Sequence, residues 1–169
     1  MACAAADQKL QVLGISEHGP GIPGTVDPFY YSNLKAVPRN LYDVTVIHGC
    51  EINVGNDGKR LLDDGWLKYL DYAIVGIHTQ CYVDQGRERN TDNLVSCMSH
   101  PKVRLVSHPD DDHTPLDYER LVSAAKDLNV ALEVNSSSFR KPDERLGCLD
   151  NYRTMLGLCQ QMRVPIVVS

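Results

Sequence analysis

The stretch VTVIHGCEIN, residues 44–53, decides the fold. Its first half is an almost unbroken run of apolar and β-branched residues, which is typical of a strand buried on both faces of a parallel sheet. Its second half carries Glu51, a group that is costly to bury unless a cation neutralises it. The stretch therefore predicts a parallel strand that delivers a charged side chain to its carboxyl end.

Similar runs recur along the chain at QVLGIS (11–16), YAIVGI (72–77), VRLVS (103–107), VALEV (130–134) and VPIVVS (164–169). The strand starts are separated by roughly 30 residues, the length of a βαβ unit. We therefore expect alternating β/α architecture, and a barrel or an open doubly wound sheet would satisfy the same pattern.

Helix-forming segments separate several of these runs. In residues 114–129, Thr114 can cap a helix and Pro115 suits its first position. Its predicted inner face carries Leu121, Val122, Ala125 and Leu128. A second helix is predicted in residues 149–162, and its inner side carries Leu149, Tyr152, Leu156, Cys159 and Met162. A shorter helix is expected from Thr91 to Met98, and the Ala-rich start resembles the end of another.

Composition limits the classes of function. The 169 residues contain enough apolar side chains for one sizeable core, so a single domain spanning residues 1–169 is expected. Seventeen basic residues against 22 acidic residues, without a basic run, argue against bulk nucleic acid as a partner. Six scattered cysteines indicate reduced thiols. The start does not resemble a signal peptide and no run is long enough to span a bilayer, so a cytoplasmic protein without membrane contact is expected.

Four predicted strands end in side chains that bind metals. These residues are His18, Glu51, His78 and His108. In β/α barrels the carboxyl ends of all strands meet at one rim, where catalytic groups gather. Three imidazoles and a carboxylate suit zinc, with manganese or iron as alternatives. A single strand-end histidine is more often an ordinary hydrogen-bonded residue, but four such residues on successive strands favour a metal site.

Other polar residues have simpler interpretations. His48, His100 and His113 lack the strand-end position and are expected to be structural or solvated. The Asp110–Asp112 run is expected to be a solvated loop, and the NDG at residues 56–58 a hairpin turn. Pro109 is expected to hold His108 in an extended conformation. Residues 135–138, NSSS, could form a phosphate-binding nest or a plain Ser-rich loop, with Arg140 and Lys141 nearby.

The motifs GISEHGPG, GCEIN, VGIH, LVSHP and ALEVNSSSF together resemble the PHP (polymerase and histidinol phosphatase) superfamily, and in particular its small bacterial phosphatases and hydrolases. The resemblance implies a distorted (β/α)7 barrel with up to three zinc ions. It also implies hydrolysis of a phosphate monoester in a small substrate by a metal-activated water. By motif, Glu51 would bridge two metals, His78 and His108 would complete one of them, and His18 would serve the third.

The sequence also departs from this family. The D-x-H-x-H motif of the first strand and the S-D-x-H motif of the last are missing, and Glu17 replaces the usual aspartate. We therefore expect a domain truncated at both ends, lacking the first strand and the end of the last. Such a chain should retain metal weakly, turn over little substrate and be poorly soluble. Two alternatives stay open: another metal-dependent hydrolase, acting on phosphodiesters or amides, and a degenerate non-catalytic metal-binding domain.

Overall fold

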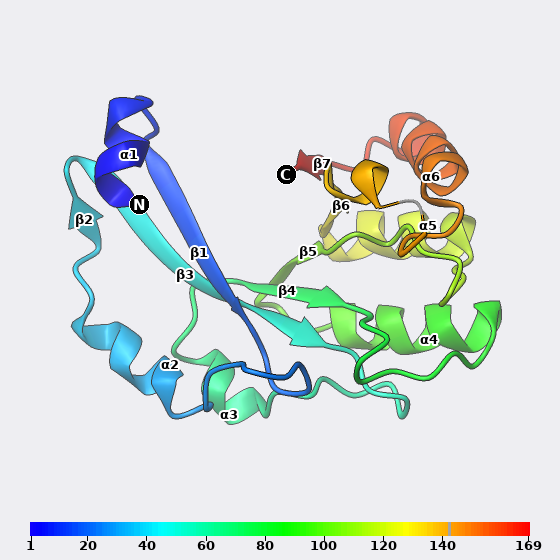
Figure 1. Ribbon diagram of the computed structural model, residues 1–169, viewed down its shortest axis with the longest axis horizontal. Helices are drawn as coiled ribbons and strands as arrows, with labels where there is room; N and C mark the ends of the chain where they lie inside the picture. Colours follow the sequence, from blue (N-terminus) through cyan, green and yellow to red (C-terminus); the bar gives the residue numbers. More distant parts are fainter. Residues whose placement is uncertain (142) are drawn as a thin grey trace.

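The computed structural model describes residues 1–141 and 143–169 as a curled parallel sheet with helices packed along it (Figure 1). The parallel strands follow one another in the order β1-β3-β4-β5-β6-β7, and the short β2 pairs antiparallel with β3. The strands are β1 (Val12–His18), β2 (Asn40–Leu41), β3 (Val44–Asn53), β4 (Ala73–Gly76), β5 (Val103–Val106), β6 (Ala131–Val134) and β7 (Ile166–Val168).

The six predicted strands are confirmed, and their order separates the two architectures that the sequence left open. Each parallel strand pairs with the next one along the chain, apart from β2. A doubly wound sheet reverses its strand order at a switch point, whereas a barrel adds strands in one direction. The sheet is therefore an α/β half-barrel, with β1 and β7 at the two ends of the described path.

The described residues contain eight helical segments. They are α1 (Ala2–Asp7), α2 (Tyr30–Asn33), η1 (Leu34–Ala36), α3 (Asp64–Leu67), α4 (Arg87–Met98), α5 (Tyr118–Leu128), η2 (Ser138–Arg140) and α6 (Cys148–Met162). The three long helices, α4, α5 and α6, lie beside β4–β7 in Figure 1. Their inner faces and the strands form a single buried core. Apolar burial of this kind is the main stabilising contribution to folding.

Several details of the helix predictions are wrong. Pro115 lies before α5 and not at its first position, and Leu128 is 36% exposed. Helix α5 is capped by Asp117, whose carboxylate accepts a hydrogen bond from the Arg120 amide, so Thr114 is not the cap. Asp117 occupies the N-cap position because it directly precedes the first helical turn. Helix α4 begins at Arg87, four residues before the predicted Thr91. Leu149 is 49% exposed, because it lies in the first turn of α6 and outside the buried face formed by Tyr152, Met155 and Cys159.

Two glycines let an aromatic ring lie directly on the sheet. Added Cβ atoms would lie 2.8 Å from the Tyr72 Oη at Gly14 and 2.5 Å from the Tyr72 ring at Gly49. The Tyr72 hydroxyl also bonds to Ser16 Oγ at 2.7 Å. Tyr72 therefore ties β1 to the segment that precedes β4.

The opposite face of β3 carries a buried thiol. Cys50 Sγ lies 2.9 Å from the Tyr31 hydroxyl of α2, within the core. Because successive side chains of a strand point to opposite faces, Cys50 and Glu51 lie on different sides of the sheet. Burial raises the pKa of Cys50 to about 11.

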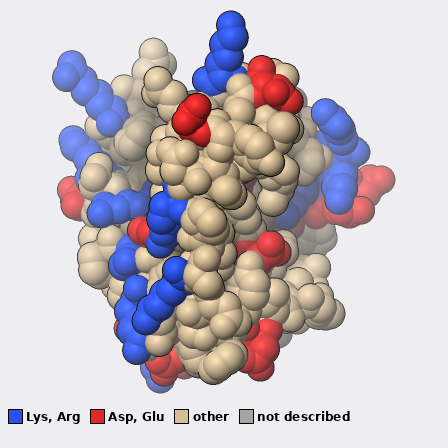
Figure 2. Space-filling view, turned by 90° about the vertical axis from the view of Figure 1, so that its left-hand side faces the viewer, with Lys and Arg blue, Asp and Glu red and all other residues tan. Residues whose placement is uncertain are grey.

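The surface near the amino terminus is unevenly charged. Figure 2 views this end, where Lys and Arg gather mainly along the left margin and an uncharged surface runs through the middle. Several large apolar side chains of this region are exposed, namely Leu10, Val12, Phe29, Tyr30 and Tyr42. Within the described residues, no helix is both long and apolar enough to cross a membrane.

Candidate metal centre

The sheet brings the four predicted ligands to one edge. His18 is the last residue of β1 and pairs in register with Glu51 of β3. His78 lies two residues beyond the end of β4, and His108 two residues beyond the end of β5. Parallel strands present their carboxyl ends to the same rim, which is why residues 90 positions apart in the sequence meet here.

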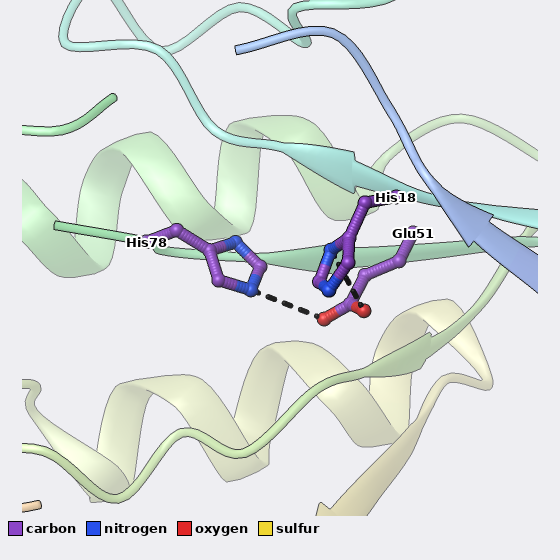
Figure 3. Close-up of side chains that lie close together, drawn as sticks. All are labelled: His18, Glu51 and His78. Atoms are coloured by element: carbon purple, nitrogen blue, oxygen red, sulfur yellow. Dashed lines mark ion pairs between the residues drawn. The ribbon is translucent and has the colours of Figure 1, made fainter. Parts of the chain in front are cut away.

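Glu51 lies at the centre of the cluster (Figure 3). Its Oε2 is 3.3 Å from His18 Nδ1, and its Oε1 is 3.3 Å from His78 Nε2. The same Oε1 is 3.2 Å from His108 Nε2. One carboxylate therefore contacts three imidazoles that come from three other segments of the chain.

The histidine rings pack edge to face around the carboxylate. The His78 ring centroid lies 5.2 Å from that of His18 and 5.0 Å from that of His108. His78 is 9% exposed, whereas His18 is half exposed. The cluster is therefore closed on the His78 side and open to solvent on the His18 side.

The protein does not satisfy the hydrogen-bonding capacity of this cluster. Glu51 Oε1 and both ring nitrogens of His78 are buried without an aligned hydrogen-bond partner. Buried polar atoms are paired in almost all native structures, so such orphans require an explanation. Ligand atoms of His18, Glu51 and His78 lie within 4.8 Å of one another. This donor set and spacing fit a divalent ion, whereas His108 lies outside this group of three and contacts only Glu51 Oε1, through its Nε2.

The protonation states suit metal binding. Burial by itself raises the pKa of Glu51, but the neighbouring His108, His78 and Ser107 outweigh it and hold the pKa far below its ordinary value. Burial lowers the pKa of His78, which Glu51 only partly opposes. At neutral pH the cluster therefore offers an ionised carboxylate and a neutral His78 imidazole, the forms that ligate metals.

A glycine makes room for the Ser107 side chain beside the cluster. A Cβ atom added at Gly76, at the end of β4, would lie 2.1 Å from Ser107 Oγ and 3.5 Å from Glu51 Oε1. Gly76 was not predicted to be part of this site, although a glycine in a strand is a known signal of close approach.

His108 does not have the predicted extended backbone. Its φ is +28°, a region that residues other than glycine rarely adopt and that costs about 1–3 kcal/mol. The effect of Pro109 is overridden by neighbouring groups. Glu133 accepts the His108 amide at 2.7 Å, and Arg145 Nη1 lies 3.1 Å from His108 Nδ1. Neither Glu133 nor Arg145 was predicted from the sequence to take part in this site.

The acidic run after His108 is only partly solvated. Asp110 is fully buried, with Oδ1 3.4 Å from Arg145 Nη1 and Oδ2 unpartnered, so the solvated-loop prediction is wrong for this residue. Burial raises the pKa of Asp110 more than Ser138 and Arg145 lower it. The cause is the return of the chain at residues 145–151, which covers this loop.

The remaining candidates lie outside the cluster. His48 is buried in β3, the His100 ring accepts from the Lys102 amide, and His113 pairs with Asp111. The turn at residues 56–58 is confirmed by the antiparallel bridge between Val54 and Arg60.

The Asn135–Ser138 segment is a closed loop. The amides of Ser136, Ser137 and Ser138 donate to Ser169 O, Asn135 Oδ1 and Asn135 O, respectively. The amides needed for a phosphate-binding nest are therefore already occupied, and the loop interpretation holds.

The chain combines an α/β half-barrel with a histidine–carboxylate cluster at its rim, whose donor set fits a divalent ion. No family model matches the chain. A probable phosphatase of Clostridium novyi is 35% identical over 166 residues, covering 98% of this chain and 67% of the relative. One of Clostridium botulinum is 37% identical over 167 residues with the same coverage, so the chain spans about two thirds of these relatives. The chain belongs to this family of probable phosphatases.

Solved structures support the fold. A chain assigned as histidinol phosphatase HisK from Listeria monocytogenes has a TM-score of 0.65 at 13% identity, covering 100% of this chain and 86% of that one. A chain from archaeal ribonuclease P with mature tRNA has a TM-score of 0.62 at 18% identity, covering 99% and 67%. At these identities the likeness concerns the fold alone.

Proposed function

We propose that this protein is a metal-dependent phosphatase of PHP type that hydrolyses a small phosphate monoester at the carboxyl-end rim of a (β/α)7 barrel. The proposal rests on membership of a phosphatase family. The single observation that carries the metal requirement is the carboxylate of Glu51, buried among three imidazoles with Oε1 unpartnered. We expect zinc, with manganese or iron as alternatives, because the donors are nitrogen and oxygen.

His18, Glu51, His78 and His108 would hold the metal. A divalent ion bound there would supply an activated water and neutralise charge on the phosphoryl oxygens. Glu51 would stay ionised at any physiological pH, because its pKa is lowered. The half-exposed His18 leaves the approach open on one side, which suits entry of a small ligand.

A hollow beside the cluster offers space for the substrate. It has a volume of about 430 Å³ and is lined by Thr79, Gln80, Asp111, His113, Glu144 and Arg145. Thr79 follows His78 directly, and Arg145 contacts His108. A guanidinium pairs well with phosphoryl oxygens, so Arg145 would hold the phosphate against the cluster. The other lining residues are polar, which favours a hydrophilic leaving group.

The test is a hydrolysis assay after loading with Zn²⁺ or Mn²⁺. The substrates are a phosphomonoester, a phosphodiester and an amide, and the variants are Glu51→Gln and the exposed control Glu119→Gln. We expect monoester hydrolysis that Glu51→Gln abolishes and Glu119→Gln preserves. Hydrolysis confined to the diester or amide would support the other hydrolase classes, and tight metal binding without turnover would support a non-catalytic domain.

A further inference from the structure

Glu133 connects the carboxyl ends of three neighbouring strands. It is the third residue of β6 and is 8% exposed. Its Oε2 accepts the backbone amide of His108, beyond β5, at 2.7 Å. Its Oε1 accepts the hydroxyl of Ser169, beyond β7, at 2.7 Å. Both carboxylate oxygens are therefore engaged by donors from the adjacent strands.

The bond to His108 acts on an unusual backbone. His108 has a φ of +28°, and its carbonyl accepts the Asp110 amide at 2.8 Å in a tight turn. Such a conformation persists only where surrounding groups hold it. A hydrogen bond from this amide to the oxygen of a buried side chain is costly to lose. Glu133 is thus well suited to keep the backbone of His108 in this turn.

The direction of the His108 ring depends on that turn. Its Nε2 lies 3.2 Å from Glu51 Oε1, and a change in φ would swing the side chain away from this contact. Glu133 itself is not a member of the cluster, because its oxygens face the His108 amide and Ser169.

We propose that Glu133 is a positioning residue that holds His108 in the orientation required for metal binding, an inference that rests on the proposed function. The hydrogen-bond acceptor matters more than the negative charge. A glutamine can still accept the His108 amide through its oxygen and donate its amide hydrogens to Ser169 Oγ. An alanine can do neither.

Four variants separate positioning from general stability. Glu133→Ala removes both bonds, and Glu133→Gln keeps the shape and the acceptor. Ser169→Ala removes only the bond on the β7 side. Glu119→Ala removes a carboxylate from the exposed side of α5 and serves as the control. Each variant is checked for folding by circular dichroism before measurement.

Two measurements give the answer. The first is the NMR shift of the His108 amide in the metal-free chain, which a hydrogen bond to a side-chain oxygen moves downfield. The second is Zn²⁺ affinity by competition with a chromophoric chelator. For Glu133→Ala we expect loss of the downfield shift and about 10- to 100-fold weaker zinc binding, the usual effect of losing a partner of a metal ligand. Glu133→Gln, Ser169→Ala and Glu119→Ala should stay within about threefold of the parent, well below that effect.

Parent-like zinc affinity in Glu133→Ala overturns the proposal, as does equal loss in Glu133→Ala and Ser169→Ala. If Glu133→Ala does not fold, Glu133→Gln decides: loss of the amide shift or of zinc affinity in this variant contradicts the acceptor role. Absence of zinc binding by the parent chain would count against the proposed function instead. In that case the NMR contact between the His108 and His78 rings tests positioning, and its survival in Glu133→Ala overturns the inference.

Discussion

Arg145 Nη1 lies 3.1 Å from His108 Nδ1, and this contact determines which ring nitrogen carries the proton. A guanidinium can only donate, so Nδ1 accepts in this contact, and a neutral ring then carries its proton on Nε2, which lies 3.2 Å from Glu51 Oε1 without the alignment of a hydrogen bond. An imidazole that ligates a metal through Nε2 carries its proton on Nδ1 instead. Metal binding at His108 and the contact between His108 and Arg145 therefore compete. A metal bound at His108 would release the Arg145 guanidinium, which could then bind an anion.

Arg145→Gln should separate the two functions of this region. Zinc affinity should be unchanged or higher, because the guanidinium that contacts His108 Nδ1 and competes with metal binding at His108 is gone. Binding of inorganic phosphate to the loaded protein should weaken by about 10- to 100-fold, the value of a charged hydrogen bond. Calorimetric titration measures both, with Arg153→Gln on the exposed side of α6 as the control. Unchanged phosphate affinity would refute the role of Arg145.

Glu51→Gln should eliminate tight metal binding. The substitution keeps the size of the side chain but removes the charge that contacts three imidazoles. Removing a residue that only supports a metal ligand weakens binding by up to about 100-fold. Glu51 is itself a proposed ligand, so we expect zinc affinity to fall by at least about 100-fold. Equilibrium dialysis measures the bound zinc, and Glu119→Gln should behave as the parent. Full zinc retention in Glu51→Gln would place the metal elsewhere.

Gly49→Ala should destabilise the half-barrel, because the new methyl group would meet the Tyr72 ring at 2.5 Å. We expect the free energy of unfolding to fall by about 1–3 kcal/mol, the usual cost of overpacking. Urea denaturation measures this change. Gly157 of α6 has open space around its added Cβ, so Gly157→Ala should stabilise the protein by about 0.5–1 kcal/mol. If Gly49→Ala leaves the free energy of unfolding unchanged, Tyr72 does not pack on Gly49 as described.

Asp110 should make stability depend on pH. Its pKa is raised by burial, so above the ordinary aspartate value of about 4 the folded state binds more protons than the unfolded state. Stability contributed by this group therefore falls as pH rises through that window. The free energy of unfolding of Asp110→Asn, relative to the parent, should increase over the same range in urea titrations. A pH-independent difference between Asp110→Asn and the parent would contradict this assignment.

The strands were predictable because their information is local. Six β-branched runs gave six parallel strands, and the residues at their ends gave the rim position of His18, Glu51, His78 and His108. Strand order was not predictable in this way, since the runs alone also fit a doubly wound sheet.

The features that failed depend on contacts between distant segments. Asp110 is buried because residues 145–151 fold over it, and the φ of His108 depends on Glu133, 25 residues away. Thr114 and Asp117 are both possible N-caps of α5 and lie three residues apart. Only the fold decides which of the two lies beside a free amide of the first helical turn, and that residue is Asp117. None of these outcomes has a signal in the immediate sequence.

The separation of Cys50 from Glu51 across β3 has a consequence for metal choice. Soft sulfur donors strongly favour zinc and copper(I) over manganese, whereas nitrogen and oxygen donors discriminate less. Cys50 faces Tyr31 and remains a protonated thiol at neutral pH, so the group formed by His18, Glu51 and His78 consists of imidazoles and a carboxylate. The supply of each ion in the cell, more than the intrinsic preference of the protein, would then decide which metal it carries.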